Sequence, residues 1–243
     1  RNANRMNYLI NELLTFSKIE MKQMHISVRK GDIMHFLEEL SHIFDIVAGE
    51  REIDFIVSLE DTKEEVWFSP SKLERILYNL LSNAFKYTQP GGYVRLSAKL
   101  IKEEKETMVQ ISVKDSGRGI PKDVQEQIFE SYYQVEKRDH REGFGLGLSL
   151  TRSLIHMHKG EIRVESEVNK GSDFIVTLNV SEDAYAPDER SSENITTEEI
   201  QKYNQRIKET IELIPEKLTN KEKDSGRESI MIVEDNKEMN DYL

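Results

Sequence analysis

Two predicted β-hairpins most strongly limit the folds that this chain of 243 residues can adopt. Residues 93–101 and 107–115 are strand-like, and the charged segment KEEKE between them predicts a turn. A second hairpin is predicted over residues 160–180, where Asn169-Lys170-Gly171 separates two strand-like segments. Hairpins of this kind build a sheet with one apolar face, and helices are needed to cover that face.

Three amphipathic helices are predicted to supply this cover, at residues 33–50, 71–88 and 146–160. Asp32 is a suitable N-cap for the first helix, Pro70 opens the second and Gly160 ends the third. The order of the segments predicts an α+β fold across residues 25–181. It is a two-layer α/β sandwich in which a mixed sheet of about five strands packs on three helices. One long amphipathic helix, in residues 1–24, precedes this domain.

The chain changes character after residue 181. Residues 182–228 are polar and highly charged, which predicts a linker that contains one helix over residues 196–214. Residues 229–243, SIMIVEDNKEMNDYL, begin a new apolar strand but are too few to fold as a domain by themselves. The chain begins with Arg rather than Met, and it is interpreted as a piece of a longer protein.

The composition excludes several kinds of function. The formal net charge is −11, so the overall field repels a nucleic-acid backbone, and any bound anion must be met by local donors. The absence of cysteine excludes a disulfide framework and thiolate metal sites. No apolar run approaches the ~20 residues of a membrane span. No signal peptide is recognisable, and we expect a soluble piece that binds no nucleic acid.

The predicted helix over residues 71–88 carries two different faces. Its apolar stripe is separate from a face on which Asn79, Asn83, Lys86 and Tyr87 recur at i, i+4, i+7 and i+8. Asparagines in the middle of a helix are compatible with a solvated surface, since Asn prefers caps and turns. With a Lys one turn further on, the same face offers amide oxygens for Mg²⁺ and an ammonium group for phosphate.

Two glycine-rich segments extend this chemistry. KDSGRGIP follows a predicted strand and contains Asp115, Gly117 and Gly119, which fit either a simple turn or a binding loop. Gly143, Gly145 and Gly147 directly precede a helix, where backbone N–H groups and the helix N-terminus favour an anion. Their spacing differs from the Rossmann and Walker motifs. The order of the segments, rather than any one of them, indicates a nucleotide site.

Five segments together resemble the N, G1, F, G2 and final boxes of histidine-kinase catalytic domains: YNLLSNAFKYT, DSGRGIP, IFESYYQ, GFGLGL and GSDFIVTL. These domains belong to the gyrase, chaperone, histidine-kinase and MutL superfamily of ATP-binding proteins. The resemblance implies that Asp115 accepts a hydrogen bond from the exocyclic amine of adenine, while Gly117 and Gly119 let the base approach. It also implies that Asn83 binds Mg²⁺ and that Lys86 contacts phosphate. Tyr87 either stacks on the adenine or packs against the helix.

The same resemblance assigns the segment from 143 to 148 to the loop that cradles the triphosphate, through Gly143, Gly145, Leu146, Gly147 and Leu148. Residues 130–142 correspond to the ATP lid, and Phe129 to the apolar latch at its start. The basic lid residues either reach phosphates or are solvated: Lys137, Arg138 and Arg141. Phe144 stands where the family often has a smaller residue, which leaves the packing of the lid open.

Asn79 bears on the type of reaction. ATP-hydrolysing members of the superfamily carry a Glu at this position to activate water, and an amide cannot act as a general base at neutral pH. The interpretation is therefore a protein-histidine kinase whose catalytic residues are Asn79, Asn83 and Lys86, with ATP and Mg²⁺ as cofactors. The alternatives are a nucleotide-binding signalling module without catalysis and an ATPase of the same superfamily.

The flanking segments resemble further parts of a hybrid two-component sensor kinase. Residues 1–24 are similar to the second helix of the dimerisation and phosphoacceptor hairpin, and residues 229–243, with Glu234 and Asp235, to the start of a receiver domain. None of the six histidines matches the family's acceptor motif: His25, His35, His42, His140, His156 and His158. The resemblance implies a homodimeric parent, anchored in the bacterial inner membrane, whose own hairpin and receiver are the partners of this cytoplasmic portion.

Overall fold

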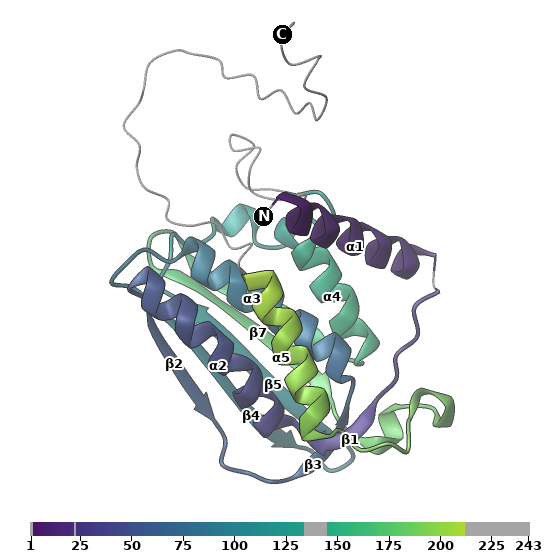
Figure 1. Ribbon diagram of the computed structural model, residues 1–243. Helices are drawn as coiled ribbons and strands as arrows, with labels where there is room; N and C mark the ends of the chain where they lie inside the picture. The colour runs from purple at the N-terminus through teal and green to yellow at the C-terminus, as the bar shows by residue number, and fades with distance from the viewer. Residues whose placement is uncertain (1, 22, 134–144, 212–243) are drawn as a thin grey trace, which may run out of the picture.

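The computed structural model describes residues 2–21, 23–133 and 145–211 of the chain. It has one five-stranded sheet with helices on one of its faces (Figure 1). The α+β sandwich predicted from the sequence is confirmed. Gly143, the basic lid residues, Phe144, His140 and the receiver-like segment 229–243 lie outside the described residues.

The main sheet has the strand order β2-β4-β5-β7-β6. Its strands are β2 (Asp54–Leu59), β4 (Tyr93–Lys102), β5 (Thr107–Asp115), β6 (Glu161–Glu167) and β7 (Gly171–Asn179). Strand β2 pairs with β4 in parallel, and all other neighbours are antiparallel. Both predicted hairpins, β4/β5 and β6/β7, are confirmed. A separate antiparallel pair joins β1 (Arg29–Asp32) to β3 (Glu65–Phe68).

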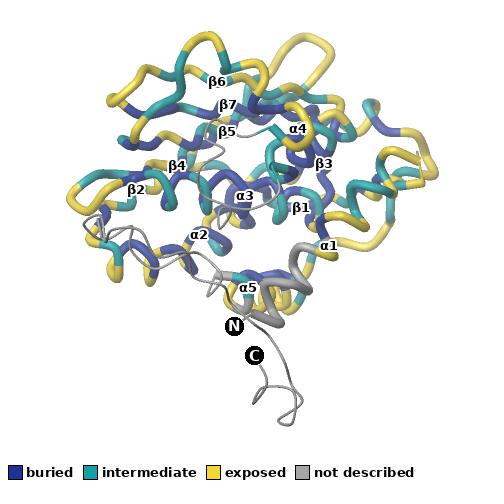
Figure 2. The backbone as a smooth tube through the Cα atoms, turned by 90° about the horizontal axis from the view of Figure 1, so that it is seen from above, coloured by how far each residue is buried: buried dark blue, intermediate teal, exposed yellow. Residues whose placement is uncertain are grey.

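Three helices lie directly on the sheet: α2 (Ile33–Arg51), α3 (Pro70–Tyr87) and α4 (Gly147–Met157). Asp32 caps α2 as predicted, since its carboxylate accepts the backbone N–H of His35 at 3.0 Å. The apolar stripe of α3 consists of residues that are all at most 4% exposed: Leu73, Ile76, Leu77, Leu80, Leu81 and Ala84. In Figure 2 the buried residues are concentrated on the central strands and on the helices that pack against them. Helix α1 (Asn2–Glu20) contacts α4.

A fifth helix, α5 (Thr197–Ile211), lies on the outer side of the helical layer, against α2 and α3 (Figures 1 and 2). Its residues Ile200, Tyr203 and Ile207 belong to the main hydrophobic core. The sequence interpretation placed this helix in a charged linker. In the structure its narrow apolar stripe, at i, i+3 and i+7, docks on the domain, while Glu198, Lys202, Arg206 and Lys208 are exposed.

The segment before α5 also attaches to the domain. It contains two short 3₁₀ helices, Glu182–Ala184 and Pro187–Glu189, and a parallel bridge joins Arg190 to Val28. Two other 3₁₀ helices, Lys122–Val124 and Gln127–Phe129, follow the turn after β5. Because Val28 lies in the stretch that enters the domain from α1, the entry and the exit of the domain lie side by side.

His158 fastens the end of α4 to the beginning of α3. The ring is fully buried; its Nε2 accepts the backbone N–H of Ser69 at 3.1 Å, and Nδ1 donates to the carbonyl oxygen of Leu154 at 2.9 Å. Burial lowers the pKa of His158 to about 4. The neutral ring is therefore a structural element of the core.

Candidate functional site

The predicted site residues of three elements meet at one end of the helical layer. These elements are the second half of α3, the turn after β5 and the first turn of α4. A Cβ atom added to Gly117 would lie 2.5 Å from the carbonyl oxygen of Tyr87, so the β5 turn packs directly on the end of α3. Asn79 of α3 reaches the first residue of α4, Gly147, through a hydrogen bond of 3.2 Å.

Asp115 ends β5 with its side chain buried. It is 4% exposed, and its Oδ1 accepts the backbone N–H of Gly117 at 2.8 Å. The backbone N–H of Ser172 on β7 is a second donor. Burial raises the pKa of Asp115 to about 6, against the opposing effect of these two hydrogen bonds. At pH 7 the group is therefore a buried anion that acts only as an acceptor.

Gly119 is required by the shape of this turn. Its φ is +66°, and an added Cβ would lie 2.0 Å from the carbonyl oxygen of Glu167. Only glycine combines a left-handed backbone with so close an approach to another strand. The glycines of the motif thus fix the turn that follows Asp115.

Two cations lie close to the ring of Tyr87. The Nζ of Lys86 is 4.8 Å from the centre of its ring, and the guanidinium of Arg118 is 4.5 Å from it. Both distances suit cation–π contacts. Arg118 was missed by the sequence reasoning, because it occupies an unremarkable position between the two glycines of the turn. Asn83, one turn before Tyr87, is half-buried on the same helix face.

The start of α4 supplies donors for an anion. Leu146 precedes the helix and has no side-chain acceptor, so it cannot cap the N–H groups of the first turn. Leu146 is buried and Leu148 is half-buried, which anchors this turn in the core. The carbonyl oxygen of Gly145 accepts the N–H of Tyr132 at 3.0 Å, so the two described ends of the lid region are joined.

Phe129 is buried at the start of the lid region, where the sequence predicts an apolar latch. Its ring meets Phe174 of β7 edge to face, with 6.3 Å between centroids, and Arg152 of α4 lies 6.0 Å from its centre. The ring of Phe129 therefore contacts both the sheet and α4, and its role as a latch stays a prediction.

Metal binding at the site depends on few protein ligands. Among residues 2–21, 23–133 and 145–211, no group of three or more His, Asp or Glu side chains is placed to hold a metal. The half-buried amide of Asn83 is a hard oxygen donor that suits Mg²⁺, which commonly takes one or two protein ligands and completes its shell with phosphate oxygens and water. The donor set thus fits a metal that arrives with a phosphate ligand.

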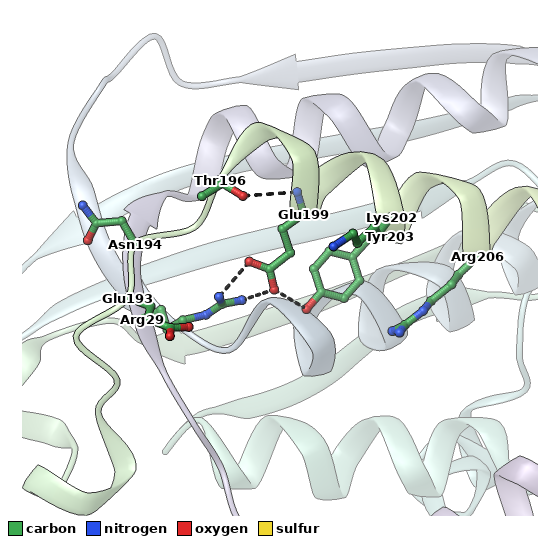
Figure 3. A pocket seen from close by; sticks show the side chains of 8 residues that line it. All are labelled: Arg29, Glu193, Asn194, Thr196, Glu199, Lys202, Tyr203 and Arg206. Carbon is green, nitrogen blue, oxygen red and sulfur yellow. Dashed lines mark hydrogen bonds and ion pairs between the residues drawn. The ribbon is translucent and has the colours of Figure 1, made fainter.

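A cavity of about 580 Å³ lies at the opposite end of the domain, where α5 begins beside β1 (Figure 3). Hydrogen bonds and an ion pair join several of its polar side chains. Arg29 makes a two-pronged ion pair with Glu199, which also accepts the hydroxyl of Tyr203 at 3.2 Å. This arrangement is a polar joint that holds α5 on the domain. It contains none of the predicted site residues.

Comparisons with known proteins agree on the type of domain. Residues 68–182 match the family described as "Histidine kinase-, DNA gyrase B-, and HSP90-like ATPase". "Histidine kinase P4" of Formosa agariphila is 31% identical over an alignment of 251 positions, and this alignment covers 99% of this chain and 18% of that protein. Among the described residues, no helix is long and apolar enough to span a membrane.

Solved structures give the same result. Full-length ShkA, in complex with AMPPNP, superposes with a TM-score of 0.65 at 25% identity, over 74% of this chain and 37% of that one. The nucleotide-free catalytic domain of histidine kinase ThkA has a TM-score of 0.55 at 25% identity, over 64% of this chain and 99% of that domain. The chain thus spans well under half of the longer relatives. Because the family model, the relatives and the solved structures agree, we conclude that it contains a catalytic domain of the sensor histidine kinase type.

Proposed function

We propose that this domain binds Mg²⁺–ATP and transfers the γ-phosphoryl group to a histidine on a phosphoacceptor helix. The observation that carries the proposal is the buried carboxylate of Asp115 beside the glycine turn, with the N-terminus of α4 and the polar face of α3 next to it. The similar protein ShkA was solved in complex with AMPPNP, which supports an adenine nucleotide as the ligand.

The carboxylate of Asp115 selects the base. A buried acceptor matches the exocyclic amine of adenine, while guanine would present a carbonyl oxygen and be repelled. A hydrogen bond to a charged group contributes roughly 1.5–3 kcal/mol. Tyr87, which contacts Lys86 and Arg118, offers a ring edge or face beside the base.

The polyphosphate is bound by local positive groups, because the chain as a whole is acidic. The N–H groups at the start of α4 and the ammonium of Lys86 neutralise it, and Asn83 gives its amide oxygen to the metal. The bound Mg²⁺ supplies charge neutralisation during transfer. Gly143 and Leu148 complete the predicted loop around the phosphates.

Phosphoryl transfer is favoured over hydrolysis by Asn79. This residue has no basic group, and its amide is already engaged with α4. A histidine imidazole needs little help from a base as nucleophile, so positioning is the main contribution of the protein.

The parent protein is proposed to be a hybrid sensor kinase. The match to P4 extends over nearly the whole chain, including the residues on both sides of the catalytic domain. On this proposal residues 1–24 continue a dimerisation hairpin that carries the acceptor histidine, and residues 229–243 begin a receiver. The parent is a membrane-anchored homodimer, and the domain works on its cytoplasmic side.

The test mixes the protein with ATP, Mg²⁺ and a separately supplied phosphoacceptor hairpin. Acid-labile phosphohistidine on the hairpin is the expected result. Steady release of inorganic phosphate without transfer would favour the ATPase, and nucleotide binding alone would favour the signalling module. Omitting Mg²⁺, or replacing Asp115 by Ala, should abolish transfer, whereas the exposed Asp123→Asn variant should retain it.

A further inference from the structure

Thr151 joins the two helices of the site through its side chain. It is fully buried on α4, where its Oγ1 donates to the carbonyl oxygen of Gly147 at 2.9 Å. The same Oγ1 accepts from Nδ2 of Asn79 on α3 at 3.2 Å. Nδ2 also donates to the Gly147 carbonyl oxygen, again at 3.2 Å. Three groups from two helices therefore form a closed set of hydrogen bonds around the first turn of α4.

We propose that Thr151 and Asn79 are a positioning pair that fixes the first turn of α4 against α3 in the orientation that binds the triphosphate. This inference rests on the proposed function. Neither side chain needs to touch the substrate. It acts through the backbone N–H groups of the turn that it holds.

The geometry separates Thr151 from the other hydroxyl groups of α4. Ser149 donates to Leu146 and Ser153 donates to Ser149, both within their own chain segment. Such local bonds are common for Ser in helices and fix nothing between elements. Thr151 makes the same type of local bond and, in addition, accepts from a second helix.

The chemistry also explains an amide at position 79. Nδ2 is the donor, because a carbonyl oxygen such as that of Gly147 can only accept. A carboxylate in this place has no proton to donate at neutral pH, and it would face the Gly147 carbonyl oxygen as a second acceptor. Both residues of the pair are buried, so losing either one removes the hydrogen bond between α3 and α4 at a place away from water.

The experiment compares ligands that use different parts of the site. Adenosine depends on the region around Asp115, whereas ATP also depends on the N-terminus of α4. Calorimetric titration of Thr151→Val, which keeps the side-chain shape but lacks the hydroxyl, should show about tenfold weaker ATP binding. Adenosine binding should change less than about twofold, so the ratio of the two affinities falls.

Two variants serve as controls. Thr151→Ser retains the hydroxyl and should restore the ATP-to-adenosine ratio. Ser153→Ala removes a hydroxyl one half-turn further along the same helix, where it bonds only Ser149, and should leave the ratio unchanged. In a double-mutant cycle, the effects of Asn79→Ala and Thr151→Val on ATP affinity should be less than additive.

The outcomes are distinguishable. If the wild-type protein binds neither ligand, the proposed function itself is wrong and the inference falls with it. If the wild-type protein binds both, an equal loss of ATP and adenosine affinity in Thr151→Val would overturn the inference in favour of a general packing role. An unchanged ratio, or failure of Thr151→Ser to restore it, would overturn it as well.

Discussion

Replacing Asp115 by Asn should make the protein more stable and its nucleotide binding weaker. Burial raises the pKa of Asp115 from an ordinary value of 3.8 to about 6. Each tenfold change in proton affinity corresponds to about 1.4 kcal/mol, so the ionised carboxylate costs the folded state about 3 kcal/mol at pH 7. Asn has the shape of a protonated carboxyl and keeps an acceptor for the N–H of Gly117, so the substitution removes this cost.

The sign of the pH dependence follows from the raised pKa. The folded state binds the proton of Asp115 more tightly than the unfolded state does, so this group makes the protein less stable as the pH rises from about 4 to about 6. The Asn variant lacks this contribution. Its advantage in unfolding free energy should therefore be near zero at about pH 4 and reach up to about 3 kcal/mol at pH 7.

Urea unfolding between pH 4 and pH 8 measures the first effect, and calorimetric titration with Mg²⁺–ATP at pH 7 measures the second. We expect ATP affinity to fall about ten- to hundredfold, because a charged acceptor for the adenine amine is lost. Asp123→Asn removes the same charge from an exposed position in the following 3₁₀ helix, and it should change the unfolding free energy by less than about 0.5 kcal/mol. An Asp115→Asn variant that is less stable at pH 7, or whose advantage does not vary with pH, would refute the reasoning.

Three further predictions concern the scaffold. Burial lowers the pKa of His158 to about 4, so the free energy of unfolding should fall as the pH drops from about 6.5 to about 4. His158→Gln should flatten this part of the pH profile measured by urea unfolding. An unaltered slope would contradict the buried, neutral state of the ring. Gly119→Ala should lower the free energy of unfolding by roughly 3 kcal/mol or more, because the residue has a positive φ and an added Cβ would clash with the neighbouring strand. Gly49→Ala should instead raise it by about 1 kcal/mol, because Gly49 lies in α2 with open space around it. Arg29→Gln breaks the ion pair with Glu199, so hydrogen exchange of the backbone amides in α5 should become about tenfold faster while exchange in α3 is unchanged. Equal protection of α5 in the variant and the wild-type protein would show that this ion pair does not hold α5 on the domain.

The sheet and its three covering helices could be predicted because their signals are local. The hairpin turns, the cap at Asp32 and the apolar stripe of α3 each depend on residues within a few positions of one another. The role of α5 was harder to predict, because its three core residues are spread through a charged sequence and a composition average hides them. Only the packing of α2 and α3 determines that such a narrow stripe becomes buried.

The candidate site divides in the same way. Asp115 and its glycines could be named from the sequence, because KDSGRGIP resembles the G1 box of the family, and their role in binding stays a prediction. Arg118 and Thr151 could not, since their importance comes from partners far away in the chain, at positions 87 and 79. A threonine within an amphipathic helix has no local feature that indicates a bond to another helix.

The buried polar groups differ in how fully the protein satisfies them, and this difference separates structure from function. Both ring nitrogens of His158 have partners inside the protein, so the ring is complete without any ligand. Asp115 receives two backbone N–H groups, while a carboxylate offers about four acceptor positions. A buried charged group with a raised pKa and too few hydrogen-bond donors around it lowers the stability of the fold when no ligand is bound. Such a group is stabilised when a ligand supplies the missing donor, which is why Asp115 rather than His158 is the residue expected to bind the nucleotide.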